Sequence, residues 1–198
     1  MKRFLTSLVA VGVAIGLAGA ARAQYFDHFE TVNPPPGGSA ISGSSTLFFL
    51  PGGNLNKFAG GDGTDVVLAN LRVTSTASDS TPDVFVVPYV ITMDLTDVAS
   101  GQFTPANAPS LLFKGTLSGT VSGGTANIVN TNTGPLFYNV TLGAVTYHVA
   151  LGTYTAPEAP GGALGAIGAH VSAVPEPGTF ALLGVGILPL LGLARRRK

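Results

Sequence analysis

His28 and Glu30 are a pair of side chains whose types and spacing could do chemistry. Residues two apart share one face of a β-strand, and an imidazole beside a carboxylate can contribute to a metal site. No other residue nearby has the spacing of a ligand. Because exposed polar residues on strands are far commoner than metal ligands, we favour a solvent-facing polar pair at this position.

The segment Gly60-Gly61-Asp62-Gly63-Thr64-Asp65-Val66-Val67 is the strongest local pattern. It matches the calcium-binding nonapeptide of parallel β-rolls, in which backbone carbonyls and aspartate supply hard oxygen ligands. The chain has one copy, whereas the ion in a β-roll lies between successive turns. A glycine-rich turn before a strand explains the same residues, and we favour it. Calcium bound by Asp62 and Asp65 is kept as a hypothesis, and we expect no other metal ion or cofactor.

Motifs of hydrolytic catalysis are missing from the sequence, which has no Gly-x-Ser-x-Gly elbow, no His-Glu-x-x-His helix and no cysteine. A Ser-His-Asp triad stays open, because triads are recognised by geometry and not by spacing. His148 lies on the polar face of its predicted strand, and His170 has no identifiable partner. The acidic residues mostly neighbour Gly, Pro, Ser or Thr, where they serve turns. We therefore expect no enzymatic activity.

The elements that must position these residues are short strands. Three segments alternate apolar and polar residues with the two-residue period of a half-buried strand: 111–121, 136–142 and 145–151. Three others are more continuously apolar, as in central strands: 46–50, 66–73 and 84–93. Glycine- and proline-rich turns separate the segments. The pattern predicts an all-β fold, with an antiparallel β-sandwich or jelly-roll-like single domain as first choice and a barrel as second.

Two details of this domain follow from its prolines and glycines. Pro88 lies inside a predicted strand and cannot donate a ladder hydrogen bond, so we expect an edge position or a bulge there. The predicted sandwich covers residues 24–155, and a segment with two prolines and two glycines follows it. Residues 156–173 are therefore either a linker towards the C-terminus or a last strand.

The charge of the domain excludes one class of partner. Between Gln24 and Ala173 the only cations are Lys57, Arg72 and Lys114, against nine Asp and Glu residues, so three minus nine gives a net charge of −6. Such a domain has no electrostatic footprint for nucleic acid. It also would not be drawn to anionic lipid by charge alone.

The N-terminus has the three parts of a secretory signal peptide. Lys2 and Arg3 precede an apolar core at residues 8–17, and Ala21-Arg22-Ala23 fits the small-x-small cleavage rule. The apolar core is too short to span a membrane. We expect signal peptidase to remove residues 1–23.

The C-terminus also has three parts in fixed order. Val174-Pro175-Glu176-Pro177 comes first, then an uncharged apolar run to Ala194, and last Arg195-Arg196-Arg197-Lys198. The prolines hold the first part extended, where a protease could bind it. As a transmembrane helix, residues 179–194 would be about 24 Å long, which is short for a hydrocarbon core of about 30 Å. The segment is built to enter a membrane and not to stay there.

These three parts resemble the PEP-CTERM sorting signal of Gram-negative bacteria, over residues 174–198. The resemblance implies recognition by a membrane enzyme, the exosortase, and a cell-surface destination often linked with exopolysaccharide. An ordinary C-terminal membrane anchor is the alternative. We expect an exported, non-enzymatic surface or extracellular-matrix protein, whose partners are signal peptidase, an exosortase, transiently the inner membrane, and exopolysaccharide. A carbohydrate-binding or adhesion module is the second expectation and an unrecognised secreted hydrolase the third.

Overall fold

The computed structural model describes residues 25–33, 39–52, 54–59 and 62–174, which belong to one compact unit, Gln24–Val174. Every regular element in these residues is a β-strand, so the prediction of an all-β fold is confirmed. No helix able to span a membrane occurs among these residues. The strands are β1 (Tyr25–Asn33), β2 (Ser39–Ser42), β3 (Ser45–Pro51), β4 (Asn54–Phe58), β5 (Thr64–Ser75), β6 (Asp83–Asp97), β7 (Leu111–Val121), β8 (Ala126–Asn132), β9 (Phe137–Leu142), β10 (Val145–Thr155) and β11 (Gly165–Val174).

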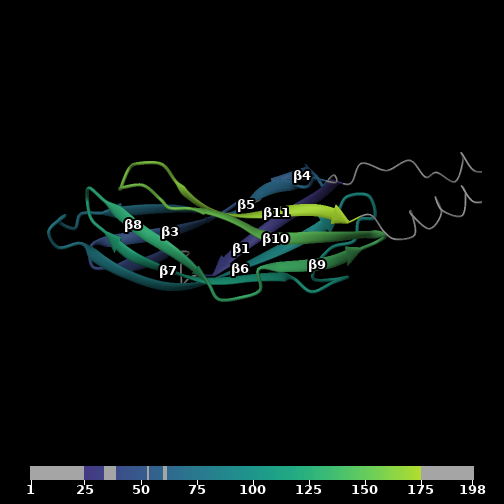
Figure 1. Ribbon diagram of the computed structural model, residues 1–198, viewed down its shortest axis with the longest axis horizontal. Coiled ribbons are helices and arrows are strands. Elements are labelled where there is room, and N and C mark those ends of the chain that lie inside the picture. Colours follow the sequence, from purple (N-terminus) through teal and green to yellow (C-terminus); the bar gives the residue numbers. More distant parts are fainter. Residues whose placement is uncertain (1–24, 34–38, 53, 60–61, 175–198) are drawn as a thin grey trace, which may run out of the picture. The chain divides into compact units, whose positions relative to one another are not determined.

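The strands form two antiparallel sheets (Figure 1). One has five strands in the order β4-β1-β6-β7-β8, and the other has six in the order β2-β3-β5-β11-β10-β9. The runs β6-β7-β8 and β9-β10-β11 and the pair β2-β3 are formed by hairpins within one sheet. The chain changes sheet between β1 and β2, β3 and β4, β4 and β5, β5 and β6, and β8 and β9. The two runs of three strands, β6-β7-β8 and β9-β10-β11, are meanders, whereas β1 to β5 cross repeatedly between the sheets.

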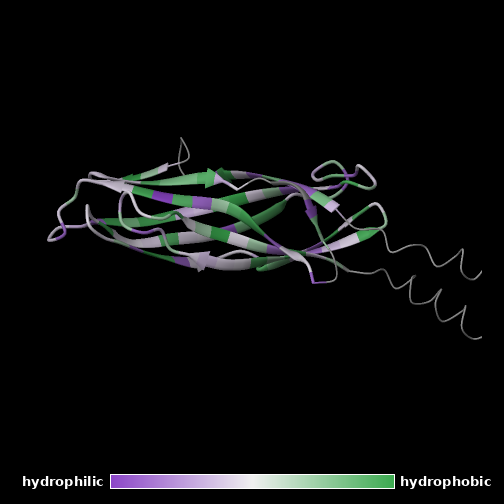
Figure 2. Ribbon diagram, turned by 90° about the horizontal axis from the view of Figure 1, so that it is seen from above, coloured by the Kyte–Doolittle hydropathy of each residue, from purple (hydrophilic) through white to green (hydrophobic). Residues whose placement is uncertain are grey.

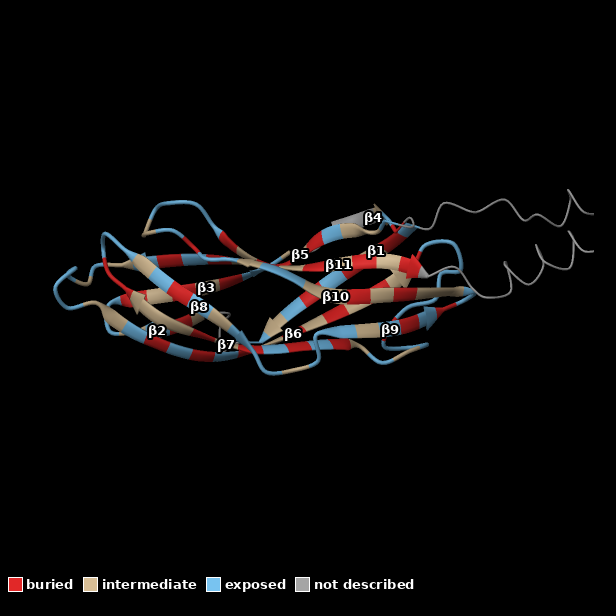
Figure 3. Cartoon of the chain, viewed as in Figure 1, coloured by how far each residue is buried: buried red, intermediate tan, exposed pale blue. Residues whose placement is uncertain are grey.

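The two sheets share one hydrophobic core. Inward residues alternate with outward ones along the strands, as the burial and hydropathy colours show (Figures 2 and 3). Three aromatic pairs join the sheets, with ring centroids 5.3–6.1 Å apart: Phe26–Tyr147, Phe49–Tyr89 and Phe113–Tyr138. Such contacts bury large apolar areas in both sheets at once, which makes the pair of sheets a sandwich.

Residues 165–174 form β11, which lies inside the six-stranded sheet between β5 and β10. Its register shifts against β5 between Ile167 and Gly168, and against β10 where that strand passes from Leu151 to Tyr154. Ile167, Ala169 and Val171 of this strand are buried in the core. The folded domain therefore continues to Val174.

Pro88 lies in β6, an inner strand of the five-stranded sheet, but within the described residues it is paired on one side only. It pairs with Thr116 of β7, whereas the pairing of β6 with β1 ends at Val90 and Asn33. Among the described residues, no strand of the sheet continues β1 beside Pro88. Among the strands that the structure describes, the missing N–H of Pro88 therefore interrupts no second ladder.

The domain begins and ends at the same end of the sandwich. Phe26, near the start of β1, contacts the ring of Tyr147, and Tyr147 pairs in register with Ala173, near the end of β11. The connections after β5, β7 and β10 lie at the opposite end (Figure 1). Both junctions with the terminal segments are therefore close together in the fold.

Candidate functional site

The sorting and cleavage residues predicted from the sequence lie outside the described residues, apart from the backbone of Val174. They are Ala21, Ala23, Pro175, Glu176, Pro177, Arg195, Arg196 and Arg197. Val174 is the last residue of β11 and pairs with Thr146 of β10, so Pro175 directly follows a paired strand residue. The folded domain thus reaches up to the Pro-Glu-Pro site.

His28 and Glu30 share one face of β1, but that face is the core and not the solvent. The two residues are 3% and 0% exposed, and Nδ1 of His28 contacts Oε1 of Glu30. The expectation of a solvent-facing polar pair is therefore wrong. Phe26 and the half-buried Val32 lie on the same face, and this alternation carries the two polar residues inward.

The surroundings of His28 are apolar. Its ring lies 5.8 Å from that of Phe26, and its neighbour in register on β6 is the buried Leu95. Its Nε2 atom is buried and has no hydrogen-bond partner in the described part of the chain. An unpaired buried nitrogen costs free energy, so the contact with Glu30 has to hold the imidazole in place.

Asp65 and His170 form the second acid–histidine pair, on the outer face of the six-stranded sheet. His170 Nδ1 lies 2.8 Å from Asp65 Oδ1, and their side chains are 41% and 90% exposed. Its other nitrogen, Nε2, faces Gly63, where a Cβ atom would come within 2.4 Å of it. The partner of His170 could not be identified from the sequence, because the two residues are 105 positions apart and only the pairing of β5 with β11 joins them.

The glycine-rich segment before β5 ends in a turn. Asp62 is exposed in this turn, Gly63 has φ of +70°, and β5 begins at Thr64. Asp62 and Asp65 are the hypothesised calcium ligands. Among the described residues no group of three His, Asp or Glu side chains could hold a metal ion. The turn and strand fit the interpretation that we favoured from the sequence.

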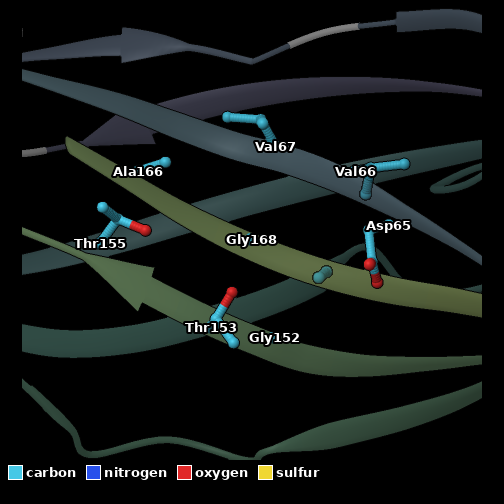
Figure 4. A pocket seen from close by; sticks show the side chains of 9 residues that line it. Asp65, Val66, Val67, Gly152, Thr153, Thr155, Ala166 and Gly168 are labelled. Atoms are coloured by element: carbon cyan, nitrogen blue, oxygen red, sulfur yellow. The ribbon is translucent and has the colours of Figure 1, made fainter. Parts of the chain in front are cut away.

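A shallow groove of about 160 Å³ lies beside the Asp65–His170 pair (Figure 4). Its floor is Ala166 and Gly168 of β11, and these small residues leave space between β5 and β10. Asp65 borders it on one side, and Thr153 and Thr155 on the other. The register shifts of β11 occur here, so the groove arises where the ladder is irregular. It offers a carboxylate and hydroxyls to a polar ligand.

His148 also faces outward, on β10 of the same sheet. Its Nδ1 lies 2.7 Å from Oδ1 of Asn139, and its ring centroid is 5.5 Å from that of Phe137. Phe137 is 58% exposed. This aromatic and amide cluster adds to the polar outer surface of the sheet.

Four acidic residues brace loops and turns, as expected from their neighbours in the sequence. Asp83 accepts hydrogen bonds from the β2–β3 turn, Asp79 from the β7–β8 turn, Asp97 from the backbone of Ser100, and Glu158 from that of Ala163. The pKa of Asp83 lies below its usual value of 3.8, chiefly because the hydroxyl of Ser45 donates to it. These carboxylates are used to close loops.

Tyr147 and Asp97 form a polar contact that joins the two sheets, and the sequence did not reveal it. The Tyr147 hydroxyl donates to Asp97 Oδ1 at 2.6 Å, and both residues are at most 1% exposed. Burial raises the pKa of Tyr147 strongly, and the neighbouring carboxylate adds to the effect. Burial also opposes ionisation of Asp97, but hydrogen bonds from Ser100 and Tyr147 outweigh it and lower its pKa.

The aromatic side chains that could stack on a glycan are mainly structural. Phe49, Phe85 and Tyr89 are buried, and Tyr138 and Tyr154 are half-buried against the core. Phe48 lies under the guanidinium of Arg72, which is 4.7 Å from its ring centroid. Phe103 is 45% exposed, in the long loop between β6 and β7. Most of these aromatic side chains therefore belong to the core or pack against it.

Comparison with known proteins identifies the C-terminal segment. A family model described as the PEP-CTERM protein-sorting motif matches residues 173–198. The chain is a PEP-CTERM domain-containing protein. No curated protein and no solved structure matches it. The resemblance of the tail is confirmed, and the matched residues overlap the last two residues of β11.

The motif has direct consequences for this PEP-CTERM protein. It marks an exported protein that an exosortase-like enzyme processes, with the cell envelope or surface as its destination. The described domain is thus the part that such sorting delivers. The candidate sites of the domain itself are the groove, the two acid–histidine pairs and the outer face of the six-stranded sheet.

Proposed function

We propose that this PEP-CTERM protein is a non-enzymatic structural component of the cell surface or extracellular matrix, associated with exopolysaccharide. The match of residues 173–198 to the sorting motif carries the proposal, because it provides for export. The use of four acidic residues as loop braces supports a structural role. The histidines support it too, because each has its Nδ1 directed at Glu30, Asn139 or Asp65 within the fold.

Fractionation of the host and the intact mass of the mature protein test this function. We expect a chain that begins at Gln24, has lost the Arg cluster, and leaves the inner membrane. Glu176→Ala should trap the unprocessed chain there. Its matched control is Glu158→Ala, since Pro157-Glu158-Ala159-Pro160 resembles the sorting site but lies within the described domain. A wild-type mass that extends to Ala194 or beyond, in the inner membrane, would refute processing.

The second candidate is a carbohydrate-binding module, and the groove over Gly168 favours it. Sugars need hydroxyl and carboxylate partners, which Thr153, Thr155 and Asp65 supply around the groove. A Cβ on Gly168 would meet its nearest atom, Val66 O, at 3.4 Å, so a side chain there fits without a clash and projects into the groove.

A glycan array with wild-type protein and Gly168→Leu tests this candidate. Binding that the substitution abolishes would favour a glycan site at the groove. Gly123→Leu is the matched control, because its Cβ has a similar nearest contact, 3.4 Å to Ala77 O, in a distant turn. No bound glycan, or equal binding by all three proteins, rules the groove out. The third candidate, a hydrolase, requires turnover that is lost on replacing one His or Asp.

A further inference from the structure

β9 is an edge strand whose outer side is open. It pairs only with β10, through a hairpin closed by the two-residue turn Gly143-Ala144. Gly143 has φ of +62°, as the first position of a type II′ turn requires. Such a turn makes Leu142 and Val145 a hydrogen-bonded pair. Hydrogen-bonded pairs alternate along an antiparallel ladder, so the backbone groups of Val140 and Tyr138 also bond to β10.

The residues between them aim their backbone groups away from the sheet. Phe137, Asn139 and Thr141 each present one N–H and one C=O to the open side. All three are exposed, and in the described chain no hydrogen bond outside the β9–β10 ladder involves these backbone groups. Tyr138, Val140 and Leu142 point to the core side, which fixes the strand in this orientation.

The usual protection of an edge strand is missing from β9. Charges, prolines, short length and bulges normally prevent edge-to-edge pairing. β9 has neither proline nor glycine, and no Asp, Glu, Lys or Arg occurs from residue 115 to residue 157. A six-residue strand of this composition also has the signature of segments that pair with copies of themselves.

The other edges are blunted. β2 has four residues, and β4 carries Lys57 and a shift of register against β1. On β8, the carbonyl of Ile128 accepts the Tyr154 hydroxyl at 2.8 Å. The contrast within one domain singles out β9 as the open edge.

We propose that β9 is a self-association edge, which pairs antiparallel with β9 of a second copy of this chain. A two-fold axis at Asn139 sets this residue opposite its counterpart and Phe137 opposite Thr141 of the other copy. Every outward N–H and C=O of the three residues then has a partner, because an antiparallel strand is complementary to itself. The two six-stranded sheets become one continuous sheet.

The distribution of charge also favours β9 as the surface at which two copies meet. Two copies of a domain with net charge −6, from three cations and nine anions, repel each other. The β9 flank is the place of least repulsion, because the uncharged run 115–157 covers β8, β9 and β10. A second copy therefore fits this edge better than a charged peptide does. The inference does not depend on what the groove binds.

Cysteine cross-linking of the full chain in detergent micelles tests the pairing. The protein has no cysteine, so Asn139→Cys introduces a single thiol next to the two-fold axis. Mild oxidation should give a disulfide-linked dimer, since facing Cα atoms of an antiparallel pair lie about 5.5 Å apart. Thr74→Cys is the matched control, because Thr74 is exposed on β5 of the same sheet, with β11 and β10 between it and β9. Equal cross-linking of both variants, or of neither, overturns the proposal.

Sedimentation of cysteine-free chains is the second measurement. Asn139→Pro removes only an outward N–H, and Asn139→Lys adds an edge charge. Each should raise the dissociation constant of the dimer about tenfold or more, whereas Asn139→Thr should leave it unchanged. Circular dichroism shows whether each variant folds. If Asn139→Pro does not fold, the dissociation constant of Asn139→Lys tests the proposal. A wild-type chain that stays monomeric, or variants that dimerise like it, overturn the proposal.

Discussion

Tyr147 of the six-stranded sheet donates a hydrogen bond to Asp97 of the five-stranded sheet, with 2.6 Å between the two oxygens. Asp97 ends β6, and its other oxygen accepts the backbone N–H of Ser100 at 2.7 Å. The ring of Tyr147 also packs on Phe26, at the start of β1. One tyrosine therefore fastens three elements at the end of the sandwich where the described chain begins and ends.

Removing this hydroxyl should destabilise the domain. Tyr147→Phe leaves a buried carboxylate without one donor, and we expect a loss of about 1.5–3 kcal/mol in the free energy of unfolding. Urea denaturation with an unchanged m-value measures it. Tyr138→Phe is the control, because that hydroxyl donates to the Leu112 carbonyl at an exposed site. We expect a loss of about 0.5–1.5 kcal/mol there. A smaller loss for Tyr147→Phe than for the control would contradict the prediction.

Acid should destabilise the domain through Asp83 and Asp97, whose pKa values are both lowered by hydrogen bonds. A carboxyl with a lower pKa in the folded than in the unfolded state stabilises the fold above about pH 4. That contribution is lost as the pH falls through the folded-state pKa. We expect Tm to drop below about pH 4, and to drop less steeply in Asp83→Asn and in Ser45→Ala, which removes the main donor. Equal acid slopes in all three proteins would refute this origin.

Alkali should destabilise the domain through its buried tyrosines. Burial raises the pKa of Tyr89, of Tyr147 and of Tyr154, the last to about 12. A tyrosine with a raised folded-state pKa stabilises the fold below about pH 10, and this contribution disappears as the pH rises further. Phenolate absorbance should therefore rise together with unfolding, measured by circular dichroism. Tyrosines that ionise fully in a still folded domain would contradict this.

The strands could be predicted where the pattern is local. The alternation of residues 111–121 predicts a strand with the bounds of β7, and residues 136–142 predict β9 to within one residue. Each of these strands has one apolar and one polar face, so a single period settles which residues are inward. The Pro-Glu-Pro tail could also be recognised, because its three parts follow one another directly in the sequence.

β1 shows where the local pattern fails. Both of its faces mix aromatic and polar residues, with Phe26 and His28 on one and Phe29 and Thr31 on the other. The pairing of β1 with β6 and the opposite sheet decide which face is inside. One local feature does indicate the inner face: the apolar residues Phe26 and Val32 lie on the same face of the strand as His28 and Glu30.

The long-range pairs needed the topology. Asp65 meets His170 only because β11 lies next to β5, and Tyr147 meets Asp97 only across the two sheets, 50 residues apart. The composition of residues 156–173 could not distinguish a linker from a last strand. A small residue such as Ala169 suits both, and only the surrounding strands show that it is covered.

Calcium should leave the stability of the domain unchanged. Asp65 already pairs with His170, and Asp62 lies in an exposed turn. We expect the Tm to shift by less than about 1 °C with millimolar calcium. A site whose dissociation constant lies well above the calcium concentration adds little to the free energy of unfolding. The control is Asp65→Asn, which should respond in the same way as the wild type. A calcium-dependent rise in Tm that Asp65→Asn removes would instead establish a site at these residues.

The buried His28–Glu30 pair should cost more when broken than when replaced as a whole. Glu30→Leu leaves the imidazole in the core without its carboxylate partner, and Nε2 has no partner within the described residues. We expect a loss of about 3–5 kcal/mol in the free energy of unfolding for this variant. His28→Leu with Glu30→Leu should recover most of that loss, because well-packed apolar side chains need no desolvation of charge or hydrogen-bonding groups.

A double-mutant cycle over both positions measures the coupling in urea denaturation. Thr31→Leu is the control for adding a leucine to β1, because Thr31 is exposed on the opposite face, and we expect a change within about 0.5 kcal/mol. If the double variant is no more stable than Glu30→Leu, the two side chains act independently and the pair has no cooperative role in the core. If the double variant regains stability, the two side chains are energetically coupled, and each is costly to bury without the other. The contact with Glu30 then stabilises an imidazole whose Nε2 atom has no hydrogen-bond partner within the described residues.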